Sequence, residues 1–240
     1  MARKAKDEIQ IDHNHDGVDR RGFLKCMAWA GTGTLCVMQG GVLKSFALSG
    51  FNKQDAAAAK GELSFAQISD SHMGFNKPAN TDVVSTLKAA VDKLNGLPSA
   101  PEFLLHTGDI SHLSRPEEFD TVEQILKSAQ AKEVFYVPGE HDVTDGDGKE
   151  YLSRYGKNTQ GVGWHSFDKK GVHFVGLVNV MNLKAGGLGS LGTDQLDWMQ
   201  KDLAALSAST PVVVFAHIPL CRFTRSGVGE QKMALRRCHC

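Results

Sequence analysis

The sequence predicts an α/β fold with largely parallel strands. Short apolar segments that suit buried strands alternate with longer segments whose apolar residues recur at helical spacing. Clusters of polar residues directly follow several of the predicted strands, the position at which ligands gather in sheets of this kind. The 240 residues, of which 41% are hydrophobic and 22% charged, are enough to bury a sizeable core.

The predicted strands are short apolar runs that end at turn residues or at polar clusters. No internal repeat interrupts their alternation with helices, which is why we expect strand–helix–strand units rather than an all-β fold. The strands are predicted at 63–69, 103–106, 134–137 and 212–216, and a hairpin is predicted at 163–168 and 171–179.

Three helices are predicted between these strands. The first spans 80–95, with Asn80 as its N-cap. The second begins at Pro116, a residue suited to the first helical position, and the third runs from a capping Thr193 to about residue 206. The apolar residues that the second helix would bury are Phe119, Val122, Ile125 and Leu126.

Charge and hydropathy exclude several functional classes. The 27 Lys+Arg balance the 27 Asp+Glu, whereas a protein that binds nucleic acid through bulk charge is usually basic, so no nucleic-acid partner is predicted. A wholly disordered chain would contain fewer apolar residues and a larger net charge. The sequence contains no strongly apolar, charge-free stretch of membrane-spanning length, which argues against a multi-span membrane protein.

The N-terminal segment resembles a twin-arginine (Tat) export signal. Arg20-Arg21-Gly22-Phe23-Leu24-Lys25 is followed by a weakly apolar, glycine-containing run at 26–43 that is too polar for a stable membrane anchor. The resemblance implies the Tat export machinery as a partner and a periplasmic or extracellular location. The alternative is an amphipathic N-terminal helix with a chance arginine pair.

The predicted domain boundaries follow from this signal. Cleavage is expected after Ala47 or near the alanine run at 56–59. Residues 1–47 are therefore assigned to the signal peptide and set aside from the fold, and residues 48–61 are assigned to a linker.

Four segments share one design, in which an apolar strand runs into a cluster of hard metal ligands. Carboxylate oxygens and imidazole nitrogens together suit Mn, Fe or Zn. An extended backbone would place Asp70 and His72 on one face, and Gly108 would let the chain turn so that Asp109 points into the site. The segments are Ile68-Ser69-Asp70-Ser71-His72, His106-Thr107-Gly108-Asp109-Ile110-Ser111-His112, Val137-Pro138-Gly139-Glu140-His141-Asp142 and Phe215-Ala216-His217-Ile218-Pro219.

These segments resemble the calcineurin-like metallophosphoesterase family. The family pattern is D-x-H, G-D-x-x-D or G-D-x-x-H, G-N-H-D/E, a lone His after a strand, and G-H-x-H; four of the five blocks are present in order. The resemblance covers residues 62–220. It implies a layered α/β/β/α metallophosphoesterase sandwich, here incomplete at the C-terminus, that acts on a phosphoester substrate.

The resemblance also implies a role for each matching residue and two divalent metal ions, with Mn, Fe or Zn expected. Asp70 and His72 would bind the first metal, Asp109 would bridge both, and Glu140 and His217 would bind the second. A metal-bridging hydroxide would attack the phosphorus in line, and His141 would protonate the leaving-group oxygen as general acid.

Two positions depart from the family pattern. Glu140 stands where the family usually has Asn, and its negative charge should tighten metal binding and reduce the positive charge of the site. His112 stands where many relatives have an Asp that orients the catalytic histidine; its alternative role is a hydrogen bond that stabilises the loop.

Other motifs have structural interpretations. The glycine-rich segment 186–192 lacks the Lys-Ser/Thr of a P-loop and is expected to form a wall of the cleft. The Asp145-Gly146-Asp147-Gly148 run lacks the spacing of a calcium loop and is expected to be an acidic turn. His165 and His173 are expected to pack in the hairpin or lie on the surface, and His106 either supports the site or ends its strand.

Residues 221–240 form an anomalous tail. They contain five basic residues against one acidic, and no G-H-x-H block. A shifted reading frame after residue 220 is one hypothesis; a genuine variant in which Cys238, His239 and Cys240 serve as substitute ligands is the other.

The leading functional hypothesis is an exported, metal-dependent phosphoesterase that hydrolyses phosphomonoesters or phosphodiesters. The alternative is a truncated, catalytically impaired metal-binding remnant of such an enzyme. A pure binding or scaffold module is a third possibility, which a metal analysis of the purified protein would test.

Overall fold

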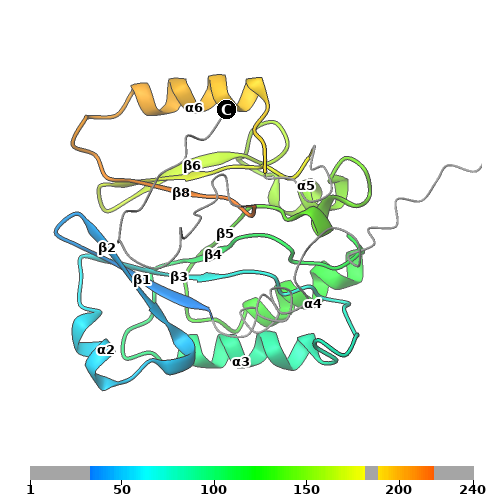
Figure 1. Ribbon diagram of the computed structural model, residues 1–240, viewed down its shortest axis with the longest axis horizontal. Helices are drawn as coiled ribbons and strands as arrows, with labels where there is room; N and C mark the ends of the chain where they lie inside the picture. Colours follow the sequence, from blue (N-terminus) through cyan, green and yellow to red (C-terminus); the bar gives the residue numbers. More distant parts are fainter. Residues whose placement is uncertain (1–32, 182–188, 219–240) are drawn as a thin grey trace, which may run out of the picture.

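The computed structural model describes residues 33–181 and 189–218, which form two β-sheets with helices on their outer faces (Figure 1). The predicted signal motif at residues 20–25 and the anomalous tail from 221 to 240 lie outside the described residues. No helix within the described residues is both long and apolar enough to cross a membrane.

The first sheet has five strands in the order β2-β1-β3-β4-β5. Strand β3 pairs in parallel with β4, and β4 with β5, whereas β1 is antiparallel to both β2 and β3. The bounds are β1 Thr34–Gln39, β2 Val42–Ala47, β3 Leu63–Ile68, β4 Leu104–His106 and β5 Val134–Tyr136.

The second sheet has three strands in the order β6-β7-β8. Strands β6 (His165–Lys169) and β7 (Val172–Gly176) form the predicted antiparallel hairpin, and β8 (Val212–Phe215) pairs in parallel with β7. His173 on β7 contacts a carboxylate with each ring nitrogen, Asp168 at 2.9 Å and Asp202 at 2.8 Å.

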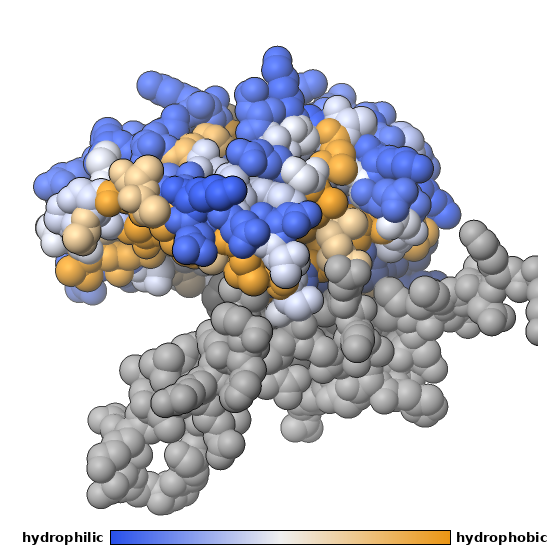
Figure 2. Space-filling view, turned by 90° about the horizontal axis from the view of Figure 1, so that it is seen from above, coloured by the Kyte–Doolittle hydropathy of each residue, from blue (hydrophilic) through white to orange (hydrophobic). Residues whose placement is uncertain are grey.

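The elements stack as four layers. Helices α3 (Val83–Asn95) and α4 (Pro116–Leu126) lie against one face of the five-stranded sheet, the second sheet lies on its other face, and α6 (Thr193–Ala204) covers the outside (Figure 1). The expected α/β/β/α layering is therefore confirmed. The face that carries α6 is mostly hydrophilic, with separate hydrophobic patches between hydrophilic side chains (Figure 2).

Strand alternation divides the interior into two cores. Along β3, Leu63 and Phe65 point into the core between the sheets, whereas Ala66 and Ile68 point into the core under the helices. The core between the sheets is rich in aromatic rings: Phe103 is fully buried, and its centroid lies 5.1 Å from that of Phe65 and 5.1 Å from that of Phe174.

The helices confirm the predicted spans but correct two caps. At α3 the cap is Asp82, whose side chain accepts a hydrogen bond from the Ser85 N–H at 2.9 Å; Asn80 instead accepts from the Asp82 N–H, before the helix begins. At α6 the cap position is Gly192, and Thr193 is the first helical residue, so Thr193 does not cap the helix. Helix α4 buries the four apolar residues expected of it.

Several short elements were not predicted. They bury few residues each; Tyr151, for example, is the buried residue of α5. The expected acidic turn precedes α5, whose N-cap position is Gly148. Asp145 accepts hydrogen bonds from the N–H groups of Gly148 and Glu150 at 2.8 and 3.1 Å and so ties the turn to the start of the helix. The elements are η1 Leu48–Gly50, α2 Lys53–Ala58, η2 Glu140–Val143 and α5 Lys149–Tyr155.

The largest difference from the sequence analysis lies in residues 34–47, which were set aside but form β1 and β2. Strand β1 pairs along β3 and buries four consecutive residues, Leu35, Cys36, Val37 and Met38. Burial raises the pKa of the Cys36 thiol to about 11. Excluding these residues from the fold was wrong, because β1 covers one edge of β3 and contributes to both cores.

Candidate metal centre

The predicted metal ligands meet at the carboxyl ends of four strands. Asp70 and His72 follow β3, Asp109 follows β4, Glu140 follows β5 and His217 follows β8. They form two groups, Asp70/His72/Asp109 and Asp109/Glu140/His217, and within each group the ligand atoms lie within 4.8 Å of one another. The structure thus brings together all five residues that the sequence analysis named.

Asp109 belongs to both groups. Its Oδ2 lies 3.3 Å from His72 Nε2 and 3.4 Å from His217 Nε2. Its Oδ1 accepts a hydrogen bond from the His141 N–H at 3.0 Å, which fixes the carboxylate plane. One oxygen is therefore within 3.4 Å of two imidazoles that follow different strands, and this carboxylate is a member of both groups.

The backbone at three ligands is left-handed. The φ angles are 57° at Asp70, 41° at His72 and 50° at Asp109. The expectation that an extended backbone aligns Asp70 with His72 was therefore wrong. Non-glycine residues in this region are uncommon and cost on the order of 1–3 kcal/mol each, so the surrounding contacts must hold them there.

Those contacts include hydrogen bonds between the loops after β3 and β4. The Asp70 N–H donates to the Gly108 carbonyl at 3.0 Å, and the His72 N–H donates to the Asp109 carbonyl at 2.8 Å. The two loops therefore continue the pairing of their parent strands and carry their ligands as one unit.

Glycine at 108 is required for two reasons. Its φ is +99°, and a Cβ there would lie 2.6 Å from the Gly139 nitrogen and 2.6 Å from His217 Nδ1. The loops after β4, β5 and β8 approach one another so closely at this point that no side chain fits. This confirms the expected turn and adds a packing reason for it.

His217 is held with one ring nitrogen facing the carboxylates. Its Nδ1 donates to the Thr107 carbonyl at 2.7 Å, because a carbonyl can only accept, and its Nε2 lies 3.0 Å from Glu140 Oε2. Burial lowers the pKa of His217, but the charges of Asp109, Glu140 and Asp70 outweigh this effect and hold the pKa well above its ordinary value. The imidazolium thus acts as counter-charge to a cluster of carboxylates.

The pKa values of Asp70 and His72 are shifted from their ordinary values. Burial, reinforced by the charges of Asp109 and Glu140, raises the pKa of Asp70 to about 6, although His217 opposes the shift. Burial lowers the pKa of His72 to about 4, which leaves a neutral imidazole near pH 7. A site with several carboxylates and a neutral imidazole is the kind that a divalent ion stabilises, and binding would displace the proton on His217.

His141 lies beside this centre with a defined tautomer. Its Nδ1 donates to the backbone carbonyl of His112 at 2.8 Å, so Nε2 is the nitrogen that can exchange a proton with a substrate. The rings of His141 and His112 stack with centroids 4.8 Å apart, and the His72 ring lies 4.8 Å from His141. His112 therefore contacts His141 with its carbonyl and its ring face, a third arrangement beside the two roles considered from the sequence.

Asp142 is a site-supporting residue that the sequence analysis quoted without assigning it a role. Its fully buried carboxylate accepts four hydrogen bonds of 2.8–3.0 Å from the loops after β4 and β5. Burial and the charge of Asp109 raise its pKa to about 6, and the backbone donors oppose the rise. The donors are the N–H groups of Ile110, Ser111 and Gly139 and the Ser111 hydroxyl.

Two further residues support the ligand loops. Glu118 at the start of α4 accepts from the N–H groups of His112 and Leu113 at 3.1 and 2.8 Å. His106 is fully buried and its Nε2 lies 2.9 Å from the Ser71 hydroxyl, so it ends its strand and also supports the loop between Asp70 and His72.

Two known proteins are similar to this chain over part of their length. The chain is 27% identical over 161 residues to a 3',5'-cyclic-nucleotide phosphodiesterase of Nostoc sp. (strain PCC 7120); the match covers 66% of this chain and 58% of that protein. Among solved structures, purple acid phosphatase PPD1 from yellow lupin (Lupinus luteus) seeds matches with a TM-score of 0.48 and 13% identity, over 73% of this chain and 33% of that one.

The chain thus spans little more than half the length of the phosphodiesterase and a third of that of the phosphatase. The calcineurin-like phosphoesterase family matches residues 63–237, a range that extends beyond residue 220, where the sequence analysis ended the domain. On this match, which covers well over half of the sequence, the chain belongs to the calcineurin-like phosphoesterase family.

Proposed function

We propose that this chain is a metal-dependent phosphoesterase whose site holds two divalent ions, with Mn, Fe or Zn expected. The observation that carries the proposal is the position of Asp109 Oδ2 between His72 and His217, which makes one carboxylate oxygen common to two ligand groups. Mixed oxygen and nitrogen donors favour these metals over Mg or Ca.

Each residue of the site has a separate proposed role. Asp70 and His72 would hold one ion, Glu140 and His217 the other, and Asp109 both. Bound ions would supply Lewis-acid polarisation of the phosphoryl group and a nucleophile generated from water. His141 would hold a proton on Nε2 and deliver it to the leaving-group oxygen, while the His112 carbonyl keeps its ring in place.

The substrate proposed is a phosphoester, with a phosphodiester favoured. Support comes from the 27% identity to the cyclic-nucleotide phosphodiesterase. Glu140 adds a charge where the family usually has an amide, and this charge favours substrates with one negative charge at phosphorus over those with two.

The first test removes the shared ligand. Asp109→Asn should abolish binding of at least one Mn²⁺ equivalent and reduce hydrolysis of bis(p-nitrophenyl) phosphate by more than about 100-fold, the upper range for losing a residue that only supports a ligand. Asp92→Asn, on the exposed side of α3, serves as the matched control and should leave both unchanged. Metal binding without hydrolysis by the wild type would favour the impaired remnant, and no metal binding would refute the proposal.

The second test separates the general acid from the metal ligands. His141→Gln should slow hydrolysis of alkyl phosphodiesters much more than that of p-nitrophenyl esters, because p-nitrophenolate leaves without a proton. Mn²⁺ affinity should stay within about threefold of the wild type. An equal loss of hydrolysis rate with both kinds of leaving group would refute the proposal that His141 is the general acid.

We also propose export by the Tat pathway to the periplasm or beyond, on the motif at residues 20–25. A double Arg20→Lys, Arg21→Lys change should abolish export, measured by cell fractionation. N-terminal sequencing of the exported product would locate cleavage. A cut after Ala47 would fall at the end of β2 and sever β1 and β2 from the rest of the sheet.

A further inference from the structure

The segment after β7 holds the chain beyond β8 through the side chain of Asn179. Asn179 is 1% exposed. Its Nδ2 donates to the Ile218 carbonyl at 2.5 Å, and its Oδ1 accepts from the Ile218 N–H at 3.2 Å. One amide therefore pairs with both backbone groups of the residue that follows the ligand His217.

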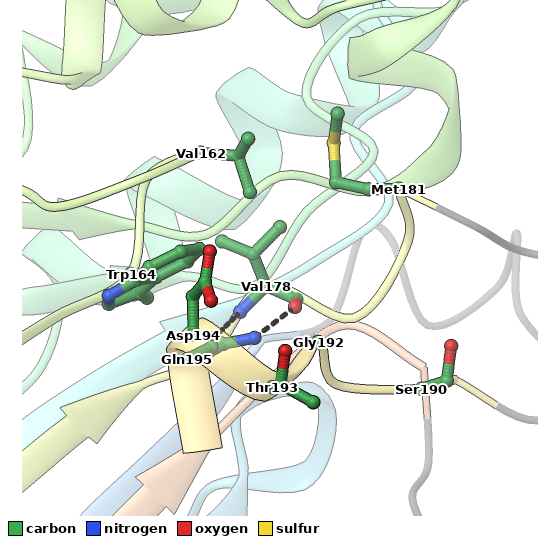
Figure 3. Close-up of a pocket in the computed structure, with 9 residues that line it drawn as sticks. All are labelled: Val162, Trp164, Val178, Met181, Ser190, Gly192, Thr193, Asp194 and Gln195. Atoms are coloured by element: carbon green, nitrogen blue, oxygen red, sulfur yellow. Dashed lines mark hydrogen bonds between the residues drawn. The ribbon is translucent and has the colours of Figure 1, made fainter. Parts of the chain in front are cut away.

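The segment that carries Asn179 is itself anchored by the same chemistry. Gln195 of α6, 2% exposed, donates from Nε2 to the Val178 carbonyl at 2.7 Å and accepts at Oε1 from the Val178 N–H at 2.8 Å (Figure 3). Gln195 and Val178 line a pocket of about 220 Å³, and none of the predicted metal ligands lines it. The backbone next to Asn179 is therefore itself fixed by Gln195, so Asn179 can hold Ile218 in a defined position.

Packing around the amide indicates that the contact is tight. A Cβ added to Gly189 would lie 2.3 Å from Asn179 Nδ2 and 2.9 Å from Ile218 Cβ. The Ser190 N–H also donates to the Asn179 carbonyl at 3.2 Å. Glycine is therefore needed at 189 so that the chain can close over the Asn179–Ile218 contact.

We infer that Asn179 is a positioning residue for the second metal ion, which it affects by fixing the backbone next to His217. This inference rests on the proposed function. The ring of His217 is oriented by the Thr107 carbonyl at Nδ1. The backbone before His217 is held by the Leu177 N–H, which donates to the Phe215 carbonyl at 2.9 Å. The Asn179 amide restrains the backbone on the other side of His217, at Ile218.

The test compares two asparagines whose side-chain amides each donate to one backbone carbonyl and accept from one backbone N–H. Asn95, at the end of α3, donates to the Ser128 carbonyl at 2.9 Å and accepts from the Gln130 N–H at 2.8 Å. Because α3 leads away from the ligand edge of the sheet, Asn95→Ala removes an equivalent clamp far from the ligands. Mn²⁺ binding to the full chain is measured by calorimetry, and hydrolysis of bis(p-nitrophenyl) phosphate is measured as a function of Mn²⁺ concentration.

Asn179→Ala should bind one Mn²⁺ equivalent about 10- to 100-fold more weakly and leave the other unchanged, and saturating Mn²⁺ should restore kcat. Gly189→Ala should do the same with the amide intact, whereas Asn95→Ala should bind both equivalents as the wild type does. Wild-type affinities in both Asn179→Ala and Gly189→Ala would overturn the inference and leave the proposed function standing. A wild type that binds no Mn²⁺ would overturn both.

Discussion

Two glycines with nearly identical φ angles allow the close approach of the loops at the candidate metal centre to be measured. Gly108 has a φ of +99° and Gly146 a φ of +98°. A Cβ at Gly108 would lie 2.6 Å from the Gly139 nitrogen and from His217 Nδ1, whereas a Cβ at Gly146 would have nothing within 4 Å. Alanine at both positions imposes the same backbone strain, and only Gly108→Ala adds a collision.

The size of the effect follows from these distances. Backbone strain should cost each variant about 1–3 kcal/mol. At Gly108 the contacts are about 0.8 Å shorter than the 3.4 Å at which ordinary contact begins, so backbone or His217 must move, at a further cost of about 1–3 kcal/mol. We therefore expect Gly108→Ala to lose about 2–6 kcal/mol of unfolding free energy and Gly146→Ala about 1–3 kcal/mol.

The assay is urea unfolding in excess EDTA, so that bound metal does not contribute. The difference between the two variants isolates the collision, because the effect of alanine on the unfolded chain is common to both. Hydrolysis should fall by about 100-fold in Gly108→Ala, since His217 is displaced by a large fraction of an ångström. Equal losses of stability in the two variants would show that the loops do not approach as described.

Three further predictions concern the fold. Phe103→Ala should lower the free energy of unfolding by about 3–5 kcal/mol in chemical denaturation, because it empties the aromatic core between the sheets; a loss below about 1 kcal/mol would contradict that packing. Burial lowers the pKa of His173, but its two aspartate partners outweigh this and raise it, so His173→Gln should cost about 2 kcal/mol near pH 6. That cost should shrink as pH rises through the raised pKa, because the stabilisation is complete only below the unfolded value of about 6.5; a cost that grows with pH would have the wrong sign. Val37→Ala on β1 should lose about 2 kcal/mol and the exposed Val42→Ala on β2 less than about 0.5 kcal/mol, and equal small losses would argue that β1 is not part of the folded domain.

The parts of the fold that could be predicted were those with a clear hydrophobic period. The strands and helices from residue 63 onward fill two cores, so their apolar spacing is visible in the sequence. Strand β1 escaped because its apolar run lies in a glycine-containing stretch that follows an arginine pair, a pattern that also suits an export signal. Helix α5 was missed because seven residues with one buried side chain show no period.

The clustering of the five proposed metal ligands could be predicted because they follow the ends of strands. The residues that hold them could not, because their roles depend on contacts across long stretches of sequence. Asp142 accepts hydrogen bonds from the N–H groups of Ile110 and Ser111, which are 32 and 31 residues away, and Asn179 is hydrogen-bonded to the backbone of a residue 39 positions away. The sequence alone does not show which Asp or Asn will be buried. Their roles become visible only when the fold shows which otherwise unpaired backbone N–H and C=O groups they bind.

The left-handed backbone at three of the proposed ligands limits which substitutions such a centre can accept during evolution. At positions 70, 72 and 109 a replacement must both bind a metal and accept a positive φ, and in practice Asp, Asn and His satisfy both demands while Glu and Cys fit poorly. Glu140 has no such backbone restriction, since it begins a 3-10 helix after Gly139. At Glu140, one of the two positions that depart from the family pattern, a substitution that changes metal preference therefore does not also have to preserve a left-handed backbone.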